Sequence, residues 1–145
     1  MLYYMFAILV IVMDQLSKYL IRAYIDMNET FTLWGIPLTH IENSGMAGGF
    51  FQGYARLLGV VAILFVIGVY YFRRTGEMKG ALIDSSLGFL VGGAIGNGID
   101  RLLFGQVTDF IIRSGGILNL ADHAIEIGGL LFIIYGVVSW LKNKH

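Results

Sequence analysis

Residues 57–72 read LLGVVAILFVIGVYYF, a run of sixteen residues without a charge. A helix that crosses a bilayer needs about 20 mostly apolar residues, and Tyr54 and Ala55 can extend this run toward that length. Three other runs have a similar length and composition. The sequence therefore predicts an all-α integral membrane protein with four transmembrane helices, at about residues 2–21, 55–72, 81–99 and 125–141.

The overall composition agrees with this prediction. Of the 145 residues, 57% are apolar and 14% are charged, whereas soluble domains average about 25% charged residues. The length fits one domain, residues 1–145. Ten basic and ten acidic residues cancel, so net charge gives no reason to expect a nucleic-acid partner. Cysteine is absent, and His40, His123 and His145 share no metal-ligand spacing, so we expect neither a metal nor a cofactor.

The distribution of charge predicts the orientation. Four spans place both termini on one side, together with the short loop 73–80. This loop and the C-terminal tail are dense in Lys and Arg, which favours the cytoplasmic side. The longer segments 22–56 and 100–123 would then lie outside. Within the first, 31–34 and 38–42 have the pattern of short strands, which predicts a small extracytoplasmic β-containing segment.

Glycine recurs every fourth residue in the third predicted span, at Gly88, Gly92 and Gly96. These positions share one helix face, and small residues there let a second helix approach closely. We expect this face to pack against another helix of the chain. A non-catalytic assembly factor that oligomerises through the face is an alternative.

Acidic residues at membrane depth are costly and suggest function. Asp84 lies within a turn of the basic loop, so we expect it at the interface near Lys79 with a structural role. Asp14 lies deeper, and Lys18 follows four residues later on the same face, which predicts an intrahelical pair. Both a structural and a site role stay open for Asp14. Glu126 opens the fourth helix, where an acid complements the helix dipole.

Asp109 and Asp122 differ from these because apolar residues flank them. Asp109 lies in GQVTDFII, residues 105–112, and Asp122 ends LNLAD just before the fourth predicted helix. The turn residues 114–116 between them predict a hairpin-like return that would bring the two acids together. Asp122 as a helix N-cap, with Asp109 as an unrelated loop acid, is the simpler interpretation. The residues alone leave both open.

Two carboxyl groups that share a site cannot both ionise easily, and the pair retains one proton. The ionised member can activate water while the protonated member donates to a carbonyl, as in aspartic proteases. A proton- or ion-coupled membrane protein is a rival interpretation, because acids at depth also form proton relays. Here the acids gather near one face and do not form a ladder across the bilayer.

Five blocks occur in order and span most of the chain: DQLSK (14–18), NSGMA (43–47), GGAIGNGIDR (92–101), GQVTDFI (105–111) and LNLAD (118–122). They resemble the signature blocks of the lipoprotein signal peptidases (signal peptidase II). The resemblance implies a membrane aspartic endopeptidase of the bacterial cytoplasmic membrane, with its active site near the outer face. Such an enzyme removes the signal peptide from prolipoproteins, cleaving before a diacylglyceryl-modified cysteine. The implied partners are diacylglyceryl-prolipoproteins and membrane lipid.

The resemblance also implies residue roles. Asp109 and Asp122 take the catalytic positions, and Asp14 is a supporting residue. Substrate-binding or bracing positions fall on Asn43, Asn97, Asp100, Arg101 and Asn119. Asparagine both donates and accepts hydrogen bonds, so it can hold a peptide backbone. Arg101 can pair with the adjacent Asp100, and we interpret these two mainly as bracing a helix end.

The second block departs from the family pattern, which continues with Ala-Ala and an aromatic residue. Here Met46 replaces the first alanine, and Gly48 and Gly49 precede Phe50. Two glycines increase the backbone freedom of a loop that would cover the substrate.

A lipid-facing opening for the diacylglyceryl chains is expected near the third and fourth spans.

Overall fold

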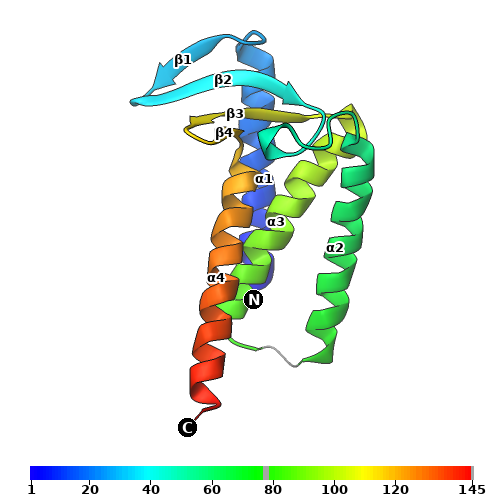
Figure 1. The fold of residues 1–145 in the computed structure, drawn as a ribbon, viewed down its shortest axis with the longest axis vertical. Helices are drawn as coiled ribbons and strands as arrows, with labels where there is room; N and C mark the ends of the chain where they lie inside the picture. The colour runs from blue at the N-terminus through cyan, green and yellow to red at the C-terminus, as the bar shows by residue number, and fades with distance from the viewer. Residues whose placement is uncertain (77–78, 145) are drawn as a thin grey trace.

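The computed structural model describes residues 1–76 and 79–144. Within these residues, four helices are long and apolar enough to cross a membrane. Figure 1 shows them side by side, with a small sheet across one end of the bundle. This confirms the predicted class of membrane protein. The helices are α1 (Leu2–Tyr24), α2 (Ala55–Thr75), α3 (Ala81–Phe104) and α4 (Leu120–Lys142).

The ends of α3 and α4 differ from the predicted spans. α3 continues to Phe104, beyond the predicted 99, and ends where Gly105 adopts a left-handed conformation with φ 71°, a common way to close a helix. α4 begins at Leu120 instead of 125 because Asn119 caps it: the Asn119 side chain accepts the Asp122 N–H, and the Asp122 side chain accepts the Asn119 N–H. This reciprocal capping box shows that Asp122 as the N-cap is wrong.

Helix α3 lies at the centre and packs against the other three helices. Its glycines permit the close approach: a Cβ added at Gly88 would lie 2.7 Å from the Tyr3 carbonyl oxygen, and one at Gly93 would lie 2.5 Å from that of Ala121. The predicted packing face is therefore confirmed. Because α1 covers Gly88 and Gly92, that face is not available for oligomerisation.

The sheet is antiparallel, with strand order β1-β2-β3-β4. Its first hairpin confirms the two strands predicted in segment 22–56, and the second outer segment forms another. Strand β2 pairs with β3 so that Asn43 lies opposite Val107 and Ile41 opposite Asp109. The strands are β1 (Thr30–Leu33), β2 (Ile36–Asn43), β3 (Val107–Arg113) and β4 (Gly116–Leu118).

A buried cluster of Ile21, Leu38 and Phe110 joins the sheet to α1. Strand β3 is thereby held against the end of the bundle, which positions Asp109 there. At the opposite end, where Asp84 was expected near the basic loop, Asp84 pairs with Arg73 of α2. Arg73 also lies over the Tyr3 ring, so this pair joins α1, α2 and α3.

Gly128 and Gly129 offer a test of the α3–α4 packing. A Cβ added at Gly128 would lie 2.8 Å from the backbone nitrogen of Leu90, whereas one at Gly129 would meet nothing within 4 Å. We expect Gly128→Ala to destabilise the fold by about 1–3 kcal/mol through overpacking. Gly129→Ala should be neutral or slightly stabilising, because alanine is the better helix former. Equal melting temperatures for the two variants in detergent would contradict this packing.

Candidate active site

The two acids singled out in the sequence lie beneath the sheet, at the end of the helix bundle. Asp109 projects from β3, and Asp122 lies in the first turn of α4. Asn119 connects them: its Nδ2 donates to Asp109 Oδ1 at 2.7 Å, and its Oδ1 accepts the Asp122 N–H at 3.0 Å. One asparagine therefore fixes a strand residue relative to a helix residue.

Asp109 is 4% exposed. Its second oxygen, Oδ2, accepts a hydrogen bond from Asn43 Nδ2 at 3.0 Å. Burial raises the pKa of Asp109 from 3.8 to about 6, and the charge of Asp122 adds to this effect, while hydrogen bonds from Asn43 and Asn119 oppose it. Asp109 therefore retains a proton much more readily than an ordinary aspartate does.

Asp122 is only partly buried. Its Oδ1 accepts from Asn97 Nδ2 at 2.8 Å, and its Oδ2 accepts the Asn119 N–H at 3.2 Å. The two carboxyl groups thus occupy different surroundings. Asp109 is buried, whereas Asp122 lies in the first turn of a helix, where backbone dipoles favour negative charge.

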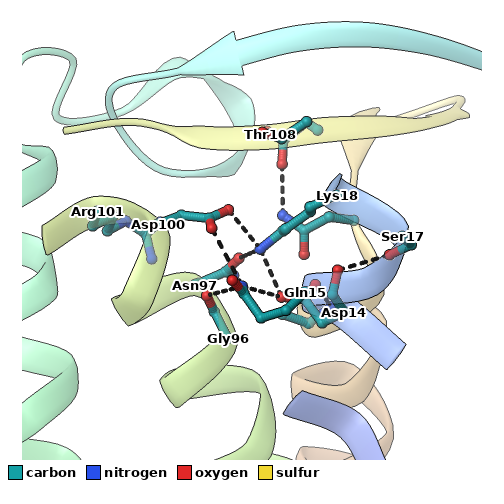
Figure 2. Close-up of polar contacts among 12 residues, drawn as sticks. Asp14, Gln15, Ser17, Lys18, Gly96, Asn97, Asp100, Arg101 and Thr108 are labelled. Carbon is teal, nitrogen blue, oxygen red and sulfur yellow. Dashed lines mark hydrogen bonds and ion pairs between the residues drawn. The ribbon is translucent and has the colours of Figure 1, made fainter. Parts of the chain in front are cut away.

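Behind Asn97 lies a buried ionic cluster, shown in Figure 2. Lys18 is fully buried, and its Nζ lies 2.8 Å from Asp14 Oδ2, 3.0 Å from Asp100 Oδ2 and 2.9 Å from Asn97 Oδ1. The other Asp14 oxygen accepts the Ala121 N–H at 2.9 Å. The predicted Asp14–Lys18 pair is therefore confirmed, and it also ties α1 to α3 and α4.

Sequence reasoning missed the larger part that Lys18 plays in this cluster. No role was predicted for Gln15. Its Nε2 donates to the Gly96 carbonyl at 3.0 Å and to Asp100 at 3.2 Å. A lysine deep in an apolar run is itself a signal, because such a charge needs partners. The spacing within α1 identifies only the partner four residues away, Asp14.

The expected pairing of Asp100 with Arg101 does not form. Successive residues point about 100° apart around a helix, so Asp100 faces Lys18 and Arg22, while Arg101 turns toward the loop after β2. There Arg101 Nη2 donates to the Gly45 carbonyl at 3.2 Å. The buried Nε of Arg101 has no protein partner, which leaves a donor available near the two acids.

Two openings reach this region. A cavity of about 330 Å³ lies beside Asp109, lined in part by Asn43, Gly48, Gly49 and Gln52. Gly48 and Gly49 both adopt left-handed conformations, with φ 77° and 81°, which explains why glycine suits these positions.

An apolar groove of about 190 Å³ lies between α2 and α3 and includes Ala62, Ala94 and Gly98. The lipid-facing opening was expected near the third and fourth spans, but α3 and α4 pack closely together and this groove lies between α2 and α3. Within residues 1–76 and 79–144, no group of three or more His, Asp or Glu side chains is arranged to hold a metal ion.

Comparisons with known proteins agree with one another. The profile of the family described as signal peptidase (SPase) II matches residues 6–138. A lipoprotein signal peptidase of Anoxybacillus flavithermus is 34% identical, covering 100% of this chain and 89% of the relative. One from Shouchella clausii is 36% identical over 98% and 97% of the two chains. A bacterial membrane enzyme solved by the in meso method at 2.3 Å superposes with a TM-score of 0.90 at 29% identity, covering 99% of this chain and 91% of that chain.

The pKa of Asp109 predicts a pH-dependent effect on stability. Because this pKa is about 6 in the folded protein and 3.8 ordinarily, the shift costs no stability below about pH 4, where the carboxyl group is protonated in both states. Above pH 6 it costs up to about 3 kcal/mol. We therefore expect Asp109→Asn to raise the melting temperature relative to the wild type at pH 8 but not at pH 4. The exposed Asp26→Asn is the control, and an equal gain at both pH values would contradict the prediction.

Proposed function

The chain belongs to the signal peptidase II family, membrane proteases that remove signal peptides from prolipoproteins, and we propose that Asp109 and Asp122 perform this hydrolysis. The observation that carries the proposal is their common attachment to Asn119, which holds a buried acid and a partly exposed acid in one site. The two environments match the different tasks of an aspartic protease pair.

In the proposed reaction, ionised Asp122 takes a proton from a water molecule, and the water oxygen attacks the scissile carbonyl carbon. Protonated Asp109 donates its proton to the carbonyl oxygen, which gives a neutral tetrahedral diol. When the C–N bond breaks, Asp122 passes its proton to the leaving nitrogen and Asp109 recovers one from the diol. The raised pKa of Asp109 supports its part as the acid.

Polar groups around the pair fit an extended peptide. We propose that Arg101 and Asn43 bind substrate carbonyl and amide groups, because Arg101 Nε is buried without a protein partner and Asn43 lies at the cavity beside Asp109. Asn97 and Asn119 hold the carboxyl groups directly. In this proposal, Asp14 and Asp100 support the site through Lys18 and do not touch the substrate.

The apolar groove between α2 and α3 supports a lipid-modified substrate. Side chains from both helices line it, and along α3 it runs from Ala94 to Leu102, past Gly98, which follows Asn97 in the chain. We propose that it receives the apolar part of a diacylglyceryl-prolipoprotein from the bilayer, so that cleavage occurs before the modified cysteine.

The arrangement of the chain supports a site near the outer face of a bacterial cytoplasmic membrane. Both termini lie at the end of the bundle opposite the sheet (Figure 1), where α2 ends with two arginines, Arg73 and Arg74. Basic residues in short segments favour the cytoplasmic side. The sheet and the two acids would then lie at the outer surface.

The acid pair is tested directly by amide substitution. We expect Asp109→Asn and Asp122→Asn each to lower cleavage of a purified diacylglyceryl-modified prolipoprotein by at least about a hundredfold, because general acid–base groups contribute roughly 10²–10⁴-fold. Gel mobility of the product is the readout. The exposed Glu126→Gln should cleave at the wild-type rate. Residual activity near wild type in either folded variant would refute this pair.

The groove is tested by two neighbouring positions on α2. Ala62 lines the groove, whereas Val61 is exposed on the outside of the helix. We expect Ala62→Phe to raise KM about tenfold with kcat little changed, because filling an apolar pocket typically costs 1–3 kcal/mol of binding. Val61→Phe should leave both constants unchanged. If the two variants behave alike, the substrate does not use this groove.

A further inference from the structure

The ammonium group of Lys18 contacts a neutral amide as well as two carboxylates. An ammonium group has three N–H donors and no acceptor, and three oxygens surround it: Asp14 Oδ2 at 2.8 Å, Asp100 Oδ2 at 3.0 Å and Asn97 Oδ1 at 2.9 Å. Lys18, Asp14 and Asp100 are all fully buried. The ammonium therefore forms ion pairs with two carboxylates and donates a hydrogen bond to the Asn97 amide oxygen.

The hydrogen bond from Lys18 determines how the Asn97 carboxamide is turned. Because the ammonium cannot accept a hydrogen bond, the Asn97 atom that faces it must be the oxygen. The amide nitrogen then faces the other way, where it donates to Asp122 Oδ1 at 2.8 Å. In the opposite orientation, the amide oxygen would face a carboxylate and the NH₂ group would face an ammonium, so both contacts would be repulsive.

We propose that Lys18 is a positioning residue that acts through Asn97 to keep Asp122 the ionised member of the acid pair. The inference rests on the proposed function of Asp109 and Asp122. Donors directed at a carboxylate favour its charged form, and a donor that is itself polarised by a cation is strengthened. Lys18 touches neither acid of the pair. Its charge also acts on Asp109 at longer range, but the hydrogen-bonded connection through the Asn97 amide leads only to Asp122.

The other charged groups around Asp122 do not provide the same asymmetry. Arg101 of α3 interacts electrostatically with both Asp109 and Asp122, so it favours ionisation of either. Asp109 of β3 is the competing acid. His123 follows Asp122 on α4, but its ring is engaged by the Asn119 carbonyl at 2.8 Å and by Arg113 of β3 at 3.3 Å. Among residues 1–76 and 79–144, Asn97 is the side chain that hydrogen-bonds both to Asp122 and to the buried ammonium of Lys18.

The test measures the dependence of kcat on pH in purified, folded variants. Lys18→Met/Asp14→Asn removes one charge of each sign and the donor to Asn97, and Asp14→Asn alone is its matched background. We expect the acidic limb of the kcat–pH profile to shift to higher pH by about one unit in the double variant. Its kcat at neutral pH should fall by up to about tenfold, and its KM should stay within about twofold of the wild-type value. In Asp14→Asn the limb should stay or move down, because a nearby negative charge is removed.

Asn97→Leu keeps all ion pairs of the cluster, but it removes both the acceptor for Lys18 and the donor to Asp122. Its acidic limb should therefore move up at least as far as that of the double variant. If the double variant does not fold, Asn97→Leu decides. An acidic limb at the wild-type position in either folded variant overturns the proposal, even where the rate is reduced. A failure of the proposed function is distinguishable, because Asp109→Asn or Asp122→Asn would then retain cleavage whatever the Lys18 variants do.

Discussion

The buried ammonium of Lys18 is the constraint on which the rest of the structure depends. A charge at this depth is tolerated only with close partners, and its partners come from two helices: Asp14 from α1 and Asp100 from α3. The helices must therefore lie nearly in contact. Glycines on α3 permit this, since a Cβ at Gly96 would lie 2.5 Å from Asp14 Oδ2. Removal of Lys18 alone would leave Asp14 without its cation and Asp100 with only the more distant Arg22.

The elements that carry the acid pair are tied to this cluster. The first turn of α4 is held by the Ala121 N–H on Asp14. Strand β3 is held through Thr108, whose hydroxyl accepts from Arg22 at 2.9 Å and donates to Glu42 at 2.9 Å. Helix α2 carries none of these ties, and the apolar groove opens along it. The acid pair is therefore held by α1, α3, α4 and β3, whereas the apolar groove is bounded on one side by α2.

Local patterns predicted the helices and the first hairpin, because an apolar run or a strand alternation is visible within a few residues. Helix ends were harder to predict: Asp100 and Arg101 resemble the end of a span, yet α3 passes through them because buried partners compensate Asp100. Asn119, and not Asp122, caps the N-terminus of α4. The contact of Lys18 with Asn97 joins residues 79 positions apart, and no local pattern reports such a contact. The family resemblance indicated which positions matter but not how their amides are turned.

The use of asparagine around the acids has a physical rationale. Asn43, Asn97 and Asn119 donate to the two carboxyl groups without bringing a charge. A cation in direct contact with both acids would stabilise both as anions, and the proposed reaction needs one proton to remain. A purely apolar lining would favour the protonated form of both and leave no base. Neutral donors on each acid, with the cation of Lys18 held one residue behind Asn97, keep the surroundings of the two carboxyl groups unequal. That inequality allows two chemically identical side chains to perform different steps.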